Sequence, residues 1–198
     1  MVSQHTNTKI NRDQIAGSLK NILSYIGDDP EREGLIDTPN RILRSWNKLF
    51  SGYGKTAEEV LGRTFESYGT YHGIITLDHI EFFSTCEHHF LPFFGQAHIG
   101  YIPKNRVVGI SKLARLVEVH ARRLQIQEKM TADIANDIQK ILNPLGVIAV
   151  IEGQHFCITS RGVEKKQAKM RTIQATGIFE NNDAKQKKFF DLIRDKNG

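Results

Sequence analysis

Apolar side chains follow a helical period in several parts of the chain. Between residues 11 and 26 they recur every three or four positions, which predicts an amphipathic helix that ends where Gly27 and Pro30 follow. Thr38 and Pro39 are suited to the start of a second helix. The other stretches with a helical period are 57–61, 111–124, 126–142 and a short segment in the C-terminal tail. The pattern therefore predicts helices at both ends of the chain and in its middle.

β-Branched and aromatic residues dominate other segments. Strands are predicted at 73–83, 94–102, 147–152 and 155–160, and more weakly at 170–179 as a strand or extended arm. Gly153 and Gln154 are expected to form a tight turn between two of these strands.

The order of these elements predicts an α+β fold. An N-terminal helical segment is expected over residues 1–62, and a ββααββ domain with an antiparallel sheet over residues 63–198. A sheet of four strands with one solvated face usually needs another subunit or a cap to cover it. Oligomerisation is therefore expected.

The composition narrows the class of protein further. The chain has 198 residues, 39% of them hydrophobic, and no run of 18 apolar residues that would cross a membrane. The N-terminus has no apolar signal segment and two cysteines are too few for a disulfide scaffold, so a cytoplasmic location is expected. The 27 basic residues exceed the 22 acidic ones, for a formal net charge of +5. This charge fits an anionic ligand or weak nucleic-acid contact and distinguishes neither.

Both cysteines lie beside histidines, in two segments far apart in the sequence. Cys86 and His89 are three positions apart and would face the same side of a tight turn, whereas His88 would point elsewhere. His155 and Cys157 would face the same side of one predicted strand. Thiolates and imidazoles are zinc ligands, so this doubled arrangement indicates a metal site rather than incidental buried cysteines.

The number of ligands decides what such a metal would do. Four protein ligands, with His155 included, would make a closed structural site, whereas three would leave a position for water, as in catalytic zinc sites. The spacing leaves this choice open, although the spare His88 favours catalysis, because a structural site needs no additional proton-transfer group. Glu87 is interpreted as a partner of a ligand, a substrate contact or an ordinary exposed charge.

Basic residues at two further places are suited to an anion. Where a turn leads into a helix, backbone N–H groups could hold phosphate together with three side chains, those of Ser111, Lys112 and Arg115. Arg161 follows a predicted strand and is also suited to an anion. On spacing alone, an N-capped helix with solvated basic residues explains the first group equally well. Gln127 and Glu128 begin the next predicted helix, where capping is the default interpretation.

Together these segments resemble the GTP cyclohydrolase I family. The resemblance extends over roughly residues 30–195 and is most specific in the run CEHHFLPF at 86–93, followed far downstream by HFC at 155–157. The other matching segments are 29–35, 38–41, 98–103, 109–115, 121–128 and 161–163.

The resemblance implies an activity and a fold. Members of the family hydrolyse GTP to 7,8-dihydroneopterin triphosphate and formate, the first step of tetrahydrofolate and related pterin pathways. The implied fold is the tunnelling fold, in which neighbouring subunits assemble small antiparallel sheets into a barrel. The usual assembly is a decamer of two pentamers with active sites between subunits. The expected partners are therefore GTP and further copies of the chain, with no nucleic acid and no membrane.

The resemblance also implies roles for individual residues. One zinc ion per subunit is expected on Cys86, His89 and Cys157, with an open position for the water that attacks C8 of the guanine. His88 and His155 are the expected acid–base groups for opening the imidazole ring, before the ribose rearranges and a new ring closes. The implied substrate contacts are Glu128 with Gln127 at the guanine edge, Ser111 near the ribose and triphosphate, and Lys112, Arg115, Arg161 and Arg44 at the triphosphate.

Three positions depart from the family pattern: Thr176 replaces an arginine, Ser160 a methionine and Phe90 a leucine. None belongs to the implied zinc set, and Thr176 bears on phosphate binding. A second hypothesis is therefore a zinc-containing protein that binds a nucleotide without opening it. A third is a basic nucleic-acid-binding protein, which is disfavoured because paired zinc-finger spacing and a basic strand interleaved with aromatic residues are both absent from the sequence.

Overall fold

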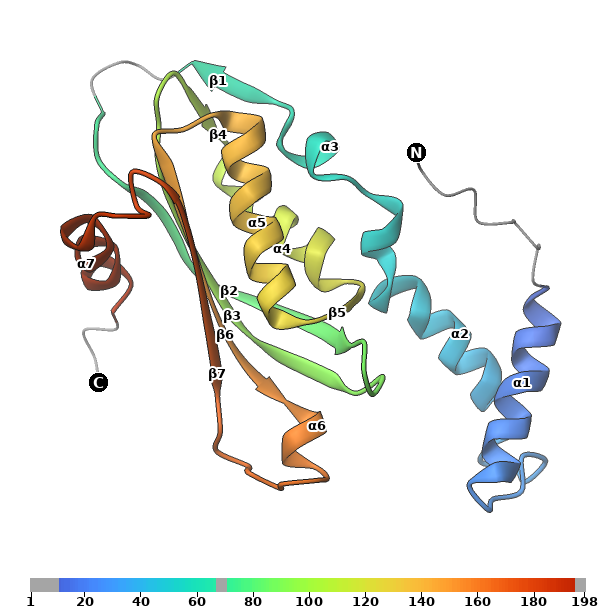
Figure 1. The fold of residues 1–198 in the computed structure, drawn as a ribbon. Coiled ribbons are helices and arrows are strands. Elements are labelled where there is room, and N and C mark those ends of the chain that lie inside the picture. Colours follow the sequence, from blue (N-terminus) through green and yellow to red (C-terminus); the bar gives the residue numbers. More distant parts are fainter. Residues whose placement is uncertain (1–10, 67–70, 195–198) are drawn as a thin grey trace, which may run out of the picture. The chain divides into compact units, whose positions relative to one another are not determined.

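The computed structural model of the protein describes residues 11–66 and 71–194. The chain divides into two compact units, Met1–Lys48 and Leu49–Gly198. The described strands all belong to the larger unit, and Figure 1 traces the elements in chain order. Among the described residues, no helix combines the length and the apolar character that crossing a membrane requires.

The smaller unit is helical, as the apolar period predicts. Its helices are α1 (Arg12–Tyr25) and α2 (Thr38–Leu49), of which the last residue crosses into the larger unit. A capping box begins α1: the Asn11 side chain accepts from the backbone of the first turn, and the Gln14 side chain accepts from the Asn11 backbone N–H at 3.0 Å.

The boundary between the units lies earlier than the predicted one after residue 62. The reason is the short helix α3, whose residues Ala57, Val60 and Leu61 are buried in the main core of the larger unit. Because burial of apolar side chains is the main stabilising term in folding, α3 packs with the sheet and its helices.

The larger unit combines a mainly antiparallel sheet with helices. In chain order its described elements are η1 (Ser51–Gly54), α3 (Ala57–Leu61), β1 (Thr64–Glu66), β2 (Ile75–Cys86), β3 (Pro92–Ile102), β4 (Arg106–Val108), α4 (Ile110–Ala121), β5 (Leu124–Gln125), α5 (Gln127–Leu142), β6 (Gly146–His155), α6 (Phe156–Thr159), β7 (Met170–Gly177) and α7 (Asp183–Ile193). The α+β class is therefore confirmed, and β2, β3, α4, α5, β6 and β7 follow the predicted ββααββ order.

The main sheet has the strand order β5-β2-β3-β6-β7. Neighbouring strands from β2 to β7 pair antiparallel, but β5 pairs parallel with β2 through Thr85↔Leu124 and Cys86↔Gln125. The sheet is therefore mixed. After α4, the two residues of β5 run beside β2 in the same direction. Two further short strands, β1 and β4, pair with each other. The hydrophobic pattern of the sequence did not predict them.

Helices α4 and α5 cover one face of the sheet, and α7 lies against the other face (Figure 1). Strand β6 is buried from both sides: Val147 and Ile151 belong to the core under α4 and α5, whereas Ile148 and Val150 pack with Phe189 of α7. Successive strand residues face opposite sides of a sheet, so burial on both faces explains the unbroken apolar run in this strand.

The predicted tight turn at Gly153 and Gln154 is wrong, as is the predicted strand 155–160. Strand β6 continues without a break through both residues to its end at position 155. Inside the sheet Gly153 pairs with Gly95 on one side and Met170 on the other. A glycine within a strand can mark a place where another group approaches closely. Here the Gln127 side chain approaches Gly153. The fourth strand of the domain is instead β7, which the sequence indicated only weakly.

Candidate metal centre and active site

A tight turn between β2 and β3 presents three residues of the predicted site. Cys86 ends β2, and its backbone N–H donates to the carbonyl oxygen of Leu91 at 2.8 Å. The backbone N–H of Phe90 donates back to the Cys86 carbonyl at 2.9 Å, with Phe90 in the left-handed region at φ +57°. These two hydrogen bonds fix the loop that carries His88 and His89, both of which are exposed.

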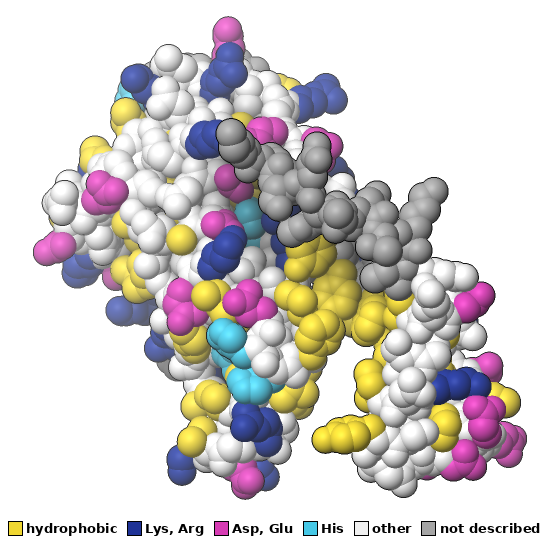
Figure 2. Space-filling model, turned by 45° about the vertical axis from the view of Figure 1, so that its right-hand side comes forward, with side chains coloured by type: hydrophobic (Ala, Val, Ile, Leu, Met, Phe, Trp, Pro, Cys, Tyr) yellow, Lys and Arg dark blue, Asp and Glu magenta, His cyan; other side chains and the backbone are white. Residues whose placement is uncertain are grey.

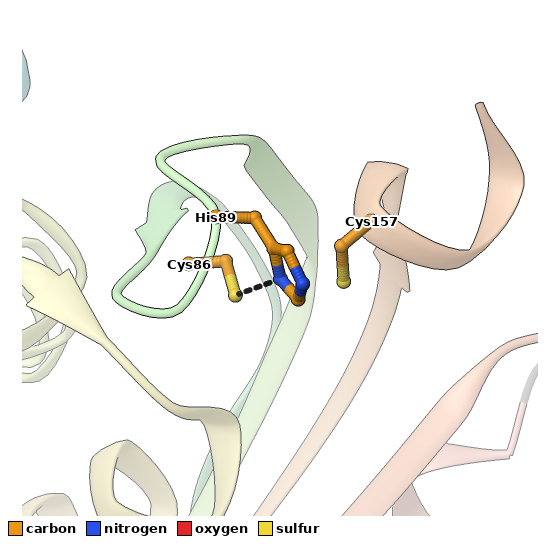
Figure 3. A group of neighbouring side chains, drawn as sticks. All are labelled: Cys86, His89 and Cys157. Atoms are coloured by element: carbon orange, nitrogen blue, oxygen red, sulfur yellow. Dashed lines mark hydrogen bonds between the residues drawn. The ribbon is translucent and has the colours of Figure 1, made fainter. Parts of the chain in front are cut away.

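Cys157 lies close to this turn because it follows β6, the strand that pairs with β3. It lies in α6, directly after β6, and its sulfur points toward the Cys86 and His89 side chains (Figure 3). The three potential ligand atoms all lie within 4.8 Å of one another, and Cys86 Sγ is 3.8 Å from His89 Nδ1. Tetrahedral zinc with its usual bond lengths places ligand atoms roughly 3.5–3.8 Å apart. The residues therefore fit a zinc ion with little movement.

His155 is not part of this group. Its Nε2 instead lies 2.9 Å from Oε1 of Gln127, whose side chain is fully buried. His155 also stacks on the ring of Phe93, with centroids 4.5 Å apart and planes 5° from parallel. These contacts favour the interpretation with three protein ligands over the closed site with four. They also correct the expectation that His155 and Cys157 share one strand face, since β6 ends between them.

His88 lies at the edge of the ligand group. Its side chain is 62% exposed, and its Nε2 lies 3.9 Å from Oε1 of Glu87. The Nδ1 atom is 3.9 Å from Cys86 Sγ, close to the distance at which His89 approaches the same sulfur. His88 is nevertheless outside the set of three, so it remains available for proton transfer.

Burial shifts two ionisable groups of the site. Desolvation lowers the pKa of His155, and the negative charge of Glu128 opposes this shift. Desolvation raises the pKa of the Cys157 thiol, and the neighbouring Cys86 raises it further, whereas the positive charge of Arg161 opposes both effects. Zinc binds the thiolate form, so metal and proton compete for Cys157.

Three of the predicted phosphate contacts lie away from the metal group of their own chain. Ser111 and Arg115 are exposed and Lys112 is half-buried in the first turns of α4. The opposite end of α4 leads to β5, where Gln125 pairs with Cys86. The 12 residues of α4 span about 18 Å, so the two groups lie at opposite ends of this helix.

Other predicted contacts are divided between the two units. Glu128 and Arg161 are exposed in the larger unit. Arg161 lies beside the metal group, because its guanidinium donates to the carbonyl oxygen of Cys157 at 3.5 Å. Arg44 is exposed on α2 in the smaller unit. Figure 2 shows histidine side chains at the surface of the larger unit, with acidic and basic side chains around them.

Thr176 lies far from the metal group of its own chain. It pairs with Val147, eight residues before His155 on β6, which is about 26 Å along the strand. Its hydroxyl donates to Gln139 Oε1 at 2.8 Å and accepts from the Val147 backbone N–H at 3.1 Å. Thr176 is thus a buried, hydrogen-bonded strand residue that joins β7 to α5.

Sequence reasoning missed the surroundings of His155. Phe93 belongs to the run CEHHFLPF, but its stacking on the imidazole depends on the pairing of β3 with β6, which no local pattern predicts. The contact between His155 and Gln127 joins residues 28 positions apart. One signal was present, namely Gly153 two residues before the histidine, but a glycine pattern alone does not distinguish a turn from a close approach.

Known proteins resemble this chain over nearly its whole length. The family model described as GTP cyclohydrolase I matches residues 15–194. A protein of Wolinella succinogenes named GTP cyclohydrolase 1 is 51% identical over 89% of this chain and 94% of its own length. Proteins with the same name from Rickettsia prowazekii and Brucella suis are 46% and 43% identical, over 94% and 98% of this chain and 98% and 92% of their own lengths.

Among solved structures, the archaeosine synthase QueF-Like in its apo form resembles 55% of this chain and 97% of its own, with 15% identity and a TM-score of 0.45. That score is too low to bear on function. The family match and the relatives instead cover nearly the whole chain at high identity. The chain therefore belongs to the GTP cyclohydrolase I family of enzymes.

Proposed function

We propose that the protein hydrolyses GTP to 7,8-dihydroneopterin triphosphate and formate, with one zinc ion per subunit, as the first step of tetrahydrofolate and pterin biosynthesis. Family membership supports the reaction. The observation that carries the proposal is the group of Cys86, His89 and Cys157, with His88 and His155 adjacent to it but outside it. A three-ligand metal site with separate proton-transfer groups is suited to the hydrolysis of a C–N bond.

The residues of the chain divide the chemical work. Cys86, His89 and Cys157 would hold zinc, which when bound supplies Lewis-acid activation of water for attack at C8 of the guanine. Breaking each C–N bond at C8 places a proton on the departing nitrogen, and His88 and His155 supply and remove these protons. Rearrangement of the ribose and closure of a new ring then complete the product.

The substrate contacts follow the same proposal. The exposed carboxylate of Glu128 accepts hydrogen bonds from the N–H groups of the guanine edge. The side chain of Gln127, the other residue assigned to this edge, is fully buried and bonded within the protein. Glu87 lies in the metal-bearing turn and contacts substrate there. The residues assigned to the ribose and triphosphate are Ser111, Lys112, Arg115, Arg161 and Arg44. Their positive charges and the α4 N-terminus complement the phosphates.

We further propose that active sites form between copies of the chain, within a tunnelling-fold barrel of two pentamers. The separation of the α4 N-terminus from Cys86 supports this arrangement, because one chain alone does not bring Ser111, Lys112 and Arg115 to its own metal group. A cytoplasmic location is also proposed, with which the two free thiols agree.

A mixing experiment tests the shared site. Cys86→Ser and Lys112→Ala chains, each inactive alone, should regain activity when co-assembled, because about one quarter of the sites in a random equal mixture then combine two intact halves. Formate release from doubly tagged, doubly purified assemblies measures this. The matched control mixes Lys112→Ala with Arg115→Ala, whose defects share one segment, and should stay inactive. Inactive mixed assemblies of the first pair would disprove the shared site.

The reaction itself is tested by incubating metal-analysed protein with GTP. We expect formate release and, after mild oxidation, neopterin fluorescence, both lost on zinc chelation and restored by zinc. A zinc-loaded protein that leaves GTP intact would overturn the proposal in favour of a nucleotide-binding relative. The position of Thr176 gives that alternative little support, because the residue lies far from the metal group of its own chain.

A further inference from the structure

The Gln127 side chain is the buried link between α5, β6 and β7. It is 0% exposed, at the first residue of α5. Its Nε2 lies 3.0 Å from the carbonyl oxygen of Ile151 and 3.1 Å from that of Met170. Carbonyl oxygens only accept hydrogen bonds, so the NH2 group of the carboxamide must face them. The Oε1 atom therefore faces His155, 2.9 Å from its Nε2.

A ring of hydrogen bonds fixes the same orientation independently. The Thr131 hydroxyl donates to the backbone carbonyl of Gln127 at 2.7 Å. Its single proton is then used, so the Thr172 hydroxyl donates to Thr131 Oγ1 at 2.6 Å. Thr172 Oγ1 in turn accepts from Gln127 Nε2 at 3.1 Å. Both hydroxyl protons are thus assigned, and the NH2 group of Gln127 shares its two protons among three acceptors. This leaves Gln127 Oε1 as the atom that faces His155.

The imidazole therefore has one tautomer that satisfies its surroundings. Because Gln127 Oε1 only accepts, Nε2 of His155 must carry the proton that joins them. The ring cannot turn away easily, since it stacks in parallel on Phe93, which is fully buried. In the neutral form, Nδ1 is then the nitrogen with a lone pair.

Gly153 makes room for this arrangement. A Cβ at position 153 would overlap Gln127 Oε1 and would lie 3.5 Å from His155 Nε2. The backbone of Gly153 lies in regular strand pairing inside the sheet, so space rather than backbone conformation excludes a side chain. The same glycine that the sequence suggested as a turn is therefore part of the support for His155.

We propose that Gln127 is a positioning residue that holds His155 as the Nε2-protonated tautomer, so that Nδ1 is the nitrogen that accepts protons during the reaction. The inference rests on the proposed role of His155 in proton transfer. It differs from a contact between Gln127 and the guanine edge, because the carboxamide is occupied by the protein itself. A guanine contact would mainly affect GTP binding, whereas a positioning role affects the chemical steps.

The tautomer can be measured without any substrate. Solid-state NMR of zinc-loaded, full-length protein with ¹⁵N-labelled histidine at pH 8 distinguishes protonated from bare ring nitrogens, and a His155→Asn spectrum assigns the signals. We expect Nε2 of His155 to be protonated in the wild type and a mixture of tautomers in Gln127→Met. A wild-type His155 protonated at Nδ1 would overturn the proposal, even if GTP proved not to be the substrate.

Kinetics with GTP provide the second readout. Gln127→Met should lower kcat for formate release by about 10- to 100-fold, with KM within about twofold, because a misplaced proton-transfer group slows chemistry without weakening binding. Gly153→Ala should change kcat in the same direction. Gly54→Ala is the matched control, because nothing lies within 4 Å of a Cβ there, and it should leave both constants unchanged. A raised KM with unchanged kcat in Gln127→Met would instead assign the residue to the guanine edge and contradict positioning.

Discussion

Replacing His89 by asparagine should remove zinc from the protein and abolish formate release. The substitution leaves two sulfur ligands, from Cys86 and Cys157, and a three-ligand site that loses one ligand binds its metal far more weakly. Loss of water activation lowers the rate by at least about 10³-fold. Metal analysis of the purified variant, together with formate release from GTP, measures both effects.

The exposed His72 offers a matched control for this experiment. His72→Asn makes the same chemical change away from the metal-bearing turn, and both its zinc content and its activity should equal those of the wild type. A His89→Asn protein that retained one zinc per chain would show that the ligand set is different from the group of three. A variant that lost zinc but kept its activity would show that the metal is not required for catalysis.

Replacing His88 by alanine should remove activity by a different route. The residue is largely exposed and outside the ligand set, so zinc content should stay at the wild-type level. The loss of a proton-transfer group should lower kcat by about 10²- to 10⁴-fold. Single-turnover formate release with zinc-loaded protein measures the chemical step directly.

The outcome separates catalysis from metal binding. If His88→Ala loses zinc in parallel with activity, the residue is a ligand, and its Nδ1 is already close to the Cys86 sulfur. If zinc and kcat both remain at the wild-type level, His88 has no part in the reaction. His72→Ala again provides the comparison, with neither quantity changed.

The sequence predicted most helices and strands because their apolar periods are long. The 16 residues of α5 repeat the helical period several times, and the residues that the period marks, such as Ile134 and Ile138, are buried. Short elements such as β5 carry too few residues for a period. The pairing of β5 depends on where α4 ends, which is a property of the tertiary structure.

The metal ligands were predictable because their chemistry is rare. Two cysteines among 198 residues, each beside histidines, limit the choices severely. The sequence left the number of ligands open, and the structure narrows it through Gln127, whose contact with His155 spans 28 positions. That contact requires α5, β6 and β7 to be packed together, and no local sequence pattern predicts a tertiary contact of this kind.

The metal group also constrains the order in which the protein can fold and bind zinc during its synthesis. Cys86 and His89 leave the ribosome together, but Cys157 follows 68 residues after His89, at the end of β6. Strand β6 must first align along β3 before the second thiol can reach the turn. A nascent chain can therefore hold zinc only loosely until most of its length has been synthesised, and tight loading marks a domain that has already folded.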